Sequence, residues 1–117
     1  MGPASQGALS LGRFARVLKG KADADWLSDL HRWWLQHSYY PEQAALAGED
    51  GTVNIQIVVD RYGHVHSVDL TGHSGSQWLD MGAQAVFRGA NLPPFPPGTQ
   101  DGEITLALTI NYILVRR

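Results

Sequence analysis

Residues 52–71 read TVNIQIVVDRYGHVHSVDLT, and this stretch decides the fold. Its first nine residues alternate between apolar and polar side chains, which is the period of a β-strand with one buried face. Residues 60–63, DRYG, predict a tight turn with Gly63 at the position that favours a positive φ. The chain then returns as a partner strand built on Val65, Val68 and Leu70. The stretch therefore predicts a β-hairpin, whose first strand has a buried face made of Val53, Ile55, Ile57 and Val59.

Two main helices are predicted, one before this hairpin in the sequence and one after it. Residues 23–37, DADWLSDLHRWWLQH, open on Asp23, a good capping residue, and repeat bulky apolar side chains at helical spacing. The tryptophans of this segment are typical of core packing, and a ligand cage is the alternative. A second, short helix is expected from Pro41 to just before Gly48. Residues 76–90, SQWLDMGAQAVFRGA, predict the other main helix.

The rest of the chain adds one long strand. Residues 92–98, LPPFPPG, are too rich in proline for regular structure. Residues 103–117, EITLALTINYILVRR, alternate along their length and present an apolar face made of Ile104, Leu106, Leu108, Ile110, Tyr112 and Leu114. This strand is longer than either hairpin strand, so we expect part of its edge to stay unpaired. The order α-β-β-α-β predicts an α+β fold, with a three-stranded antiparallel sheet and two main helices packed on one face.

The sequence divides into a leader, residues 1–22, and a folded domain, residues 23–117. Leu9, Phe14 and Val17 lie among basic residues in the leader. This pattern is typical of a solvated tail, and a short basic amphipathic helix that docks on the domain is the alternative. We therefore predict a flexible or weakly helical leader.

Composition excludes several classes of protein. The chain has 117 residues, the length of one domain, and no cysteine, which excludes disulfides and thiolate metal sites. Nine basic and eleven acidic residues give a formal net charge of −2, whereas a general nucleic-acid binder needs a basic stripe. No apolar run approaches the roughly 20 residues that span a bilayer, and no secretory signal is recognisable.

Residues 71–80, TGHSGSQWLD, suggest a hydrolase at first sight, because Ser74 has a histidine beside it and an aspartate six residues later. A nucleophile elbow needs G-x-S-x-G, but Ser76 stands where the second glycine is required. We interpret Ser74 and Gln77 as a capping box at the start of a helix, with Ser76 as the alternative cap. Asp80 then complements the helix dipole and bonds nearby backbone. We predict no catalytic residue and no enzyme.

Three histidines raise the question of a metal site. His64 and His66 lie two residues apart on one face of the second hairpin strand, and His73 follows. Such a pair binds zinc or nickel weakly, and a specific site needs a third ligand and supporting groups. No Asp or Glu is spaced to help, so we expect solvated histidines, no metal and no cofactor.

The order of the turn and capping residues resembles a known family. The sequence contains Tyr40-Pro41-x-x-Ala44, Gly48, Gly51-x-Val53, Gly63-x-Val65, Ser74-Gly75-x-x-x-Leu79-Asp80, Ala83, Ala90 and Pro94-x-Pro96, followed by the long final strand. This ordered set resembles the TonB C-terminal domain of Gram-negative bacteria, with a HasB-like paralogue as one form of it. The resemblance implies a structural role for Gly63, Ser74, Gly75, Leu79, Asp80, Pro94 and Pro96.

The resemblance also implies a function in the periplasm. Proteins of this family transmit proton-motive-force energy from the inner-membrane ExbB–ExbD complex to outer-membrane transporters for siderophores, haem or cobalamin. An N-terminal helix anchors the full-length protein in the inner membrane, and a proline-rich spacer follows it; we expect both to be absent from this chain. The domain is expected to grip the TonB box, a short extended segment of the transporter, and no nucleic acid.

The expected contact is β-augmentation, in which an extended peptide adds a strand to an exposed sheet edge. The last strand is the candidate, because no downstream segment is expected to cover its edge. A weak homodimer could pair through the same edge. Residues 9–18 are hypothesised to compete with the peptide for it. By resemblance, the Tyr-Pro segment borders the peptide, with core packing and a helix start as the alternative. The residues expected to bind the partner are Tyr39, Tyr40, Pro41, Glu103, Thr105, Leu106, Ala107, Leu108, Thr109, Ile110, Asn111, Tyr112 and Ile113.

Three other functions remain as alternatives. A TolA-like adaptor shares the fold and the periplasm but maintains the cell envelope. A structural oligomerisation domain would use the same sheet edge, and a small hydrolase or metal-binding module would depend on Ser74 or the histidines. The Tyr-Pro and Leu-Asp pairs favour the TonB-like function. Departures from the family's pattern, such as His73 in place of the first serine of Ser-Ser-Gly, bear on which transporter is served.

Overall fold

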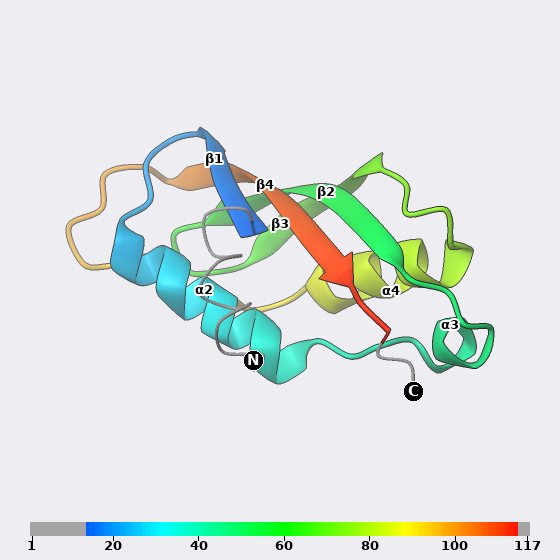
Figure 1. Cartoon of the computed structure of the whole chain (residues 1–117). Helices are drawn as coiled ribbons and strands as arrows, with labels where there is room; N and C mark the ends of the chain where they lie inside the picture. Colours follow the sequence, from blue (N-terminus) through cyan, green and yellow to red (C-terminus); the bar gives the residue numbers. More distant parts are fainter. Residues whose placement is uncertain (1–13, 115–117) are drawn as a thin grey trace.

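The computed structural model describes residues 14–114, which form one antiparallel sheet with helices on one of its faces (Figure 1). The sheet is four-stranded, with the strand order β1-β4-β2-β3. In chain order the elements are β1 (Ala15–Lys19), α2 (Ala24–His37), α3 (Glu42–Leu46), β2 (Gly51–Asp60), β3 (Val65–Gly72), α4 (Gln77–Phe87) and β4 (Glu103–Tyr112). The α+β class and the packing of both main helices on one face are confirmed.

The centre of the sheet is the pairing of β2 with β4. The two strands align over their full ten residues, from Gly51 opposite Tyr112 to Asp60 opposite Glu103. Their predicted apolar faces point at the helices and are buried along nearly their whole length. On the other face, polar side chains bond across the strands, as where the Thr109 hydroxyl donates to Asn54 at 3.0 Å.

The β2–β3 hairpin closes through the predicted turn. Gly63 has a φ of 90°, and a Cβ atom at this position would lie 2.0 Å from the carbonyl oxygen of Leu92. Glycine is therefore required both for the backbone angle and for the close approach of the loop. The Leu92 N–H donates to the Gly63 carbonyl at 2.7 Å, which fastens the proline-rich loop to the turn.

Tryptophans join the two main helices, as core packing predicts. Asp23 caps α2 by accepting a hydrogen bond from the Trp26 N–H at 2.7 Å. Trp26, Leu30 and Trp34 are buried along one face of α2. The Trp34 ring stacks on Phe87 of α4, with centroids 5.4 Å apart and planes 2° from parallel. The ligand-cage alternative is thus not needed to explain these side chains.

The prediction of three strands is wrong, because residues 15–19 form a fourth strand, β1, beside β4 (Figure 1). These residues were expected in a solvated tail or a basic helix. Phe14 and Ala15 are buried, while Arg16 and Lys19 are exposed. A bare edge on β4 provides hydrogen-bonding partners that a five-residue segment lacks by itself, so tertiary pairing overrides its weak local pattern.

Two predicted elements end earlier than expected. The final strand stops at Tyr112 instead of continuing to Arg117, and residues 115–117 lie outside the described residues. Helix α4 ends at Phe87, and Gly89 then takes a φ of 65°. Within residues 14–114, every helix is too short or too polar to cross a membrane.

Candidate peptide-binding edge

Strand β4 is the predicted site, and the structure places it second from one edge of the sheet. Its inner side pairs completely with β2. Its outer side pairs with β1 from Ala15 opposite Leu108 to Lys19 opposite Thr105. Within residues 14–114, no strand pairs with residues 109–112 on that outer side. The expected open edge is therefore divided into a covered half and an uncovered half.

The Tyr-Pro segment lies beside the uncovered half. The Tyr40 ring meets Tyr112 edge-on, with centroids 5.4 Å apart, and its hydroxyl donates to the Glu49 carbonyl. Pro41 is buried against Gly82 of α4, where a Cβ atom would approach the proline ring to 2.6 Å. Core packing thus accounts for Pro41, which does not belong to the accessible surface.

Two apolar side chains at this end of β4 are exposed. Tyr39 is 53% exposed and Ile113, directly after β4, is 62% exposed. Ile113 follows the buried Tyr112 directly in sequence, and Tyr39 precedes Tyr40, whose ring contacts Tyr112. The structure therefore brings together Tyr39, Tyr40 and the end of β4, which lie far apart in the sequence.

Tyr112 carries a buried hydroxyl that has no hydrogen-bond partner among the described residues. Burial raises the pKa of this phenol well above its ordinary value, and the neighbouring hydroxyls of Tyr39 and Tyr40 raise it further. A buried unpaired donor costs about 1–3 kcal/mol. Tyr112 therefore stays neutral in the native state, and its hydroxyl contributes nothing evident to folding.

The serine-rich junction before α4 is structural. Ser76, rather than Ser74, caps the helix: its hydroxyl accepts from the Leu79 N–H at 3.3 Å and donates to Glu49 at 2.6 Å. The capping box predicted at Ser74 is thus wrong. Gly75 takes a φ of 92° between the two serines and sets the later start of the helix.

Asp80 holds this junction together. One of its carboxylate oxygens accepts from the Ser74 N–H at 2.9 Å, and the other lies 3.2 Å from Nδ1 of His73. Partial burial acts to raise the pKa of Asp80, but the hydrogen bonds from Ser74 and His73 outweigh it and lower that pKa. The Ser74 hydroxyl donates to the Ser76 carbonyl instead of to a histidine, so no nucleophile is activated here.

The histidines beside the hairpin turn have a carboxylate neighbour that the sequence analysis missed. Asp60 lies 2.7 Å from Nε2 of His66 and 3.6 Å from Nδ1 of His64, because the turn brings the end of β2 back beside β3. Asp60 also accepts hydrogen bonds from the backbone N–H groups of Tyr62 and His64. Even so, no group of three side chains among residues 14–114 is arranged to hold a metal ion.

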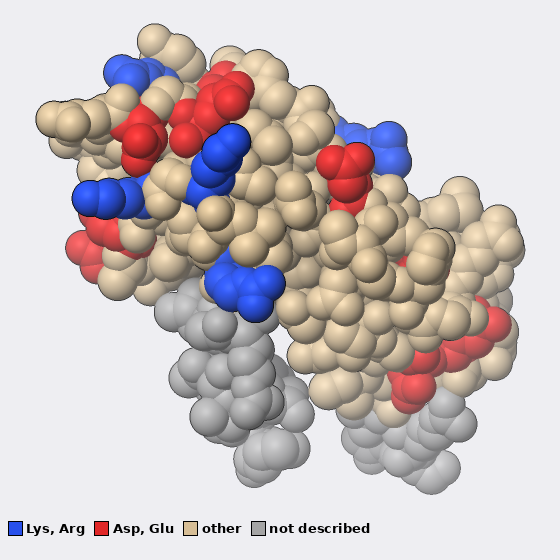
Figure 2. All heavy atoms as spheres, turned by 90° about the horizontal axis from the view of Figure 1, so that it is seen from above, with Lys and Arg blue, Asp and Glu red and all other residues tan. Residues whose placement is uncertain are grey.

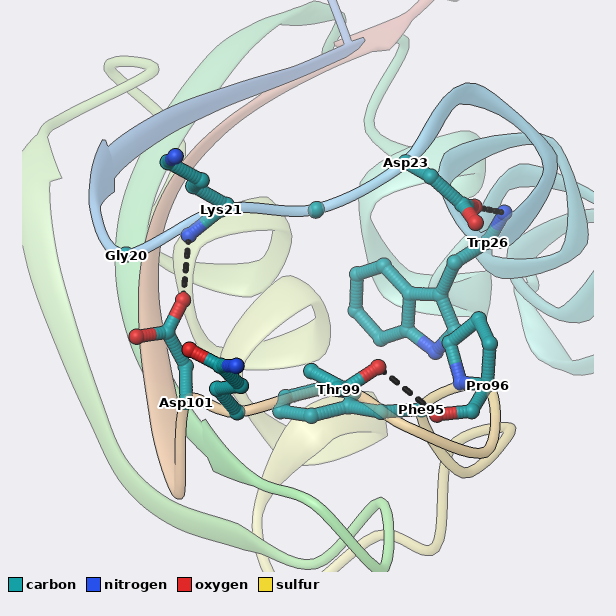
Figure 3. Close-up of a pocket in the computed structure, with 10 residues that line it drawn as sticks. Gly20, Lys21, Asp23, Trp26, Phe95, Pro96, Thr99 and Asp101 are labelled. Atoms are coloured by element: carbon teal, nitrogen blue, oxygen red, sulfur yellow. Dashed lines mark hydrogen bonds between the residues drawn. The ribbon is translucent and has the colours of Figure 1, made fainter.

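The proline-rich loop packs on α2 and borders a cleft. Phe95 meets Trp26 edge-on at 5.4 Å, and the Trp26 indole N–H donates to the Pro93 carbonyl at 2.8 Å. Pro94 and Pro96 flank this aromatic contact and are exposed. The cleft has a volume of about 800 Å³ and lies between this loop and the segment that joins β1 to α2 (Figure 3).

The uncovered face of the sheet carries no dominant charge. Figure 2 views the molecule from the sheet side and shows charged groups of both signs scattered among uncharged surface. A duplex or single-stranded nucleic acid needs a continuous basic surface. In this view the face lacks such a continuous basic surface.

Comparison with known proteins agrees with this geometry. The family described as Gram-negative bacterial TonB protein C-terminal matches residues 36–114. The chain is 35% identical over 94 residues to Protein TonB of Pseudomonas putida; the alignment covers 79% of this chain and 39% of that protein. The chain thus spans well under half the length of this relative.

Solved structures share the fold. The solution structure of a Helicobacter pylori TonB C-terminal domain, residues 179–285, gives a TM-score of 0.67 at 18% identity and covers 100% of this chain and 99% of its own. A shorter form of that domain, residues 194–285, gives 0.60 at 20% identity and covers 81% and 100%. The family match extends from the end of α2 through β4, which is most of the chain. This protein therefore belongs to the non-enzymatic TonB C-terminal family of Gram-negative bacteria.

Proposed function

We propose that this domain binds the TonB box of an outer-membrane transporter by adding the box as a strand to the outer edge of β4. The contact begins at the uncovered half, residues 109–112, where backbone groups lie beside exposed Tyr39 and Ile113. The observation that supports this most strongly is a ten-residue strand whose outer side has no strand partner, within residues 14–114, over its second half. Long bare edges are an aggregation hazard that folded proteins normally cover.

The energetics suit a reversible coupling. Each added ladder hydrogen bond contributes about 0.5–1.5 kcal/mol net, and ordering an extended peptide removes a part of the gain. A short box then binds with a dissociation constant in roughly the micromolar range. Because pairing is through main-chain groups, the site accepts boxes of differing side chains.

At the level of the whole protein, we propose a periplasmic role. A longer protein, anchored in the inner membrane and associated with ExbB and ExbD, would transmit proton-motive-force energy through this domain to the transporter. Siderophore, haem or cobalamin uptake is the process served. The family membership supports this role, and the TolA-like and oligomerisation alternatives have no comparable support.

The test is calorimetric titration with a synthetic TonB-box peptide. Tyr39→Ala removes an exposed aromatic beside the uncovered edge and should weaken binding at least about fivefold, or roughly 1 kcal/mol. Met81→Ala is the matched control, because Met81 on α4 has the same exposure of 53%. Equal affinities for both variants and the parent protein would argue against a contact at this end of β4.

A further inference from the structure

Strand β1 and a partner peptide would use the same backbone groups of β4. The pairing of Ala15–Lys19 covers residues 105–108 on the outer side of β4. We propose that β1 is an internal competitor: it closes half of the binding edge, and a partner must displace it to pair along the whole of β4. This inference rests on the proposed function, since it concerns the regulation of the same edge.

The geometry of β1 is that of an added strand. It runs antiparallel to β4 at the sheet edge and has no second strand on its other side within residues 14–114. Its ladder is interrupted, because the register shifts between Val17 and Lys19 and leaves Leu18 without a partner on β4. A bulge of this kind loses ladder pairing and is typical of sheet edges. β1 is thus paired over a shorter and less regular stretch than a peptide could achieve.

Burial is equally uneven along β1. Phe14 and Ala15 are buried, but Leu18 is 45% exposed, and Arg16 and Lys19 are exposed as well. By contrast, the core-facing residues of β2 are fully buried. Three residues therefore attach this segment: Phe14 just before β1, Ala15, and the half-buried Val17. The Phe14 ring centroid lies 5.1 Å from that of His31 and 6.0 Å from that of Trp34. Sparse apolar contact is what marks segments that open locally.

The connection to α2 allows β1 to leave without unfolding that helix. Gly20 has a φ of 86°, and a Cβ there would lie 2.8 Å from Ile104, so the chain turns sharply at this point. The Lys21 N–H then donates to Asp101 at 2.9 Å beside the cleft (Figure 3). Helix α2 keeps its own cap at Asp23. Release can therefore stop at residues 20–21.

The consequence for binding follows from the fraction of molecules in which β1 is released. A ligand that needs the open edge binds with an apparent affinity reduced by that fraction. Weakening β1 should tighten binding, and locking β1 should weaken it. A peptide confined to residues 109–112 would respond to neither change.

The test uses an engineered disulfide that holds β1 against β4 and can be reduced again. It is made in the whole chain, which contains no native cysteine. Ala107 lies opposite Arg16 of β1 on one side and opposite Gln56 of β2 on the other. Directly opposed residues of antiparallel strands lie within the Cα separation of a disulfide. Arg16→Cys with Ala107→Cys therefore locks β1, and Gln56→Cys with Ala107→Cys is a matched control that locks two strands already fully paired.

Each protein is titrated with the synthetic TonB-box peptide, oxidised and reduced, and followed by amide chemical shifts. We expect oxidation to weaken binding at least about tenfold in the β1 lock, to remove the shifts at residues 105–108, and to change nothing in the control. If oxidation affects both locks equally, β1 does not gate the edge. Phe14→Ala should tighten binding, and a peptide that fails to bind even this variant overturns strand addition itself.

Hydrogen exchange tests the displacement without any peptide. In the parent protein, the β4 amides directed at β1 should exchange at least about tenfold faster than those directed at β2, through local opening. Oxidation of the β1 lock should abolish the difference. Equal protection of both sets in the parent protein would overturn the proposal, whatever the peptide does.

Discussion

The hydroxyl of Tyr112 is the clearest anomaly at the scale of single residues. It is buried beside Tyr40 and has no hydrogen-bond partner among the described residues. Removing an unpaired buried donor relieves a desolvation cost. We therefore predict that Tyr112→Phe leaves the free energy of unfolding unchanged or raises it by up to about 1 kcal/mol, as measured by urea denaturation. A loss of more than this would mean that the hydroxyl has a bonding partner.

The raised pKa of Tyr112 also leads to a prediction of how the stability of the protein changes at alkaline pH. Burial raises the folded-state pKa of Tyr112 above its unfolded value of about 10. The neutral phenol thus contributes stability that is complete below pH 10 and is lost as pH rises toward the folded pKa. Denaturation midpoints measured from pH 8 to pH 11 should fall less in Tyr112→Phe than in the parent protein. Parallel curves would contradict the pKa shift.

The pKa of Asp80 is shifted in the opposite direction from that of Tyr112, so its contribution to stability is lost at acid pH. Its folded pKa is lowered by its bonds to Ser74 and His73, so its stabilising effect is present above the unfolded pKa of about 3.9 and is lost as pH falls through the folded pKa. We predict that Asp80→Ala costs about 1–3 kcal/mol at pH 7. Asp69→Ala, at an exposed position of β3, should cost less than about 0.5 kcal/mol. Equal losses would remove Asp80 from its role in the strand-to-helix junction.

At the scale of elements, the packing of the segment that leads into β1 affects the pKa of a histidine on α2. Burial lowers the pKa of His31, and the Phe14 ring that precedes β1 packs edge-on against this imidazole. We predict that Phe14→Ala moves the pKa of His31 up toward its ordinary value of about 6.5, as followed by the ring proton shifts of His31 during a pH titration. No movement at His31 would place its burial elsewhere than under Phe14.

The elements differ in how far the sequence could predict them. The β2–β3 hairpin and both main helices were predictable because apolar residues repeat regularly along each of them. Turn and cap residues also mark their ends, such as Gly63 in the turn and Asp23 at the cap of α2. β1 was not, because five residues give too short a period and their partner strand lies far along the chain. The cap of α4 was assigned to Ser74 instead of Ser76 because either serine fits the capping pattern and only the backbone at Gly75 decides.

The same division applies to the candidate site. The residues of β4 were predicted from the long final strand and its expected open edge. The Tyr-Pro segment was predicted from the family resemblance, and the contact between Tyr40 and Tyr112 joins the two in space. What the sequence missed is the half-covered edge, which depends on tertiary pairing with β1. Asp60 beside His64 and His66 was missed for a related reason, since the turn brings it back to β3.

At the scale of the whole molecule, the edge of β4 is also a place where two copies could meet. Strand addition requires this edge to be available to a partner at the working concentration of the protein. We therefore predict that sedimentation velocity finds a monomer from about 1 to 100 μM, the range of the expected affinity for the peptide. A stable dimer at low micromolar concentration would favour the oligomerisation alternative.

The proposed function depends on a TonB-box peptide adding to the outer edge of β4. The most direct measurement is a titration of the isotope-labelled domain with such a peptide, followed by amide chemical shifts. We predict changes that begin at residues 109–113 and around Tyr40 and extend to residues 105–108 at saturation, with β3 and its turn unchanged. Shifts concentrated on β3, or flat spectra at millimolar peptide, would contradict strand addition at this edge.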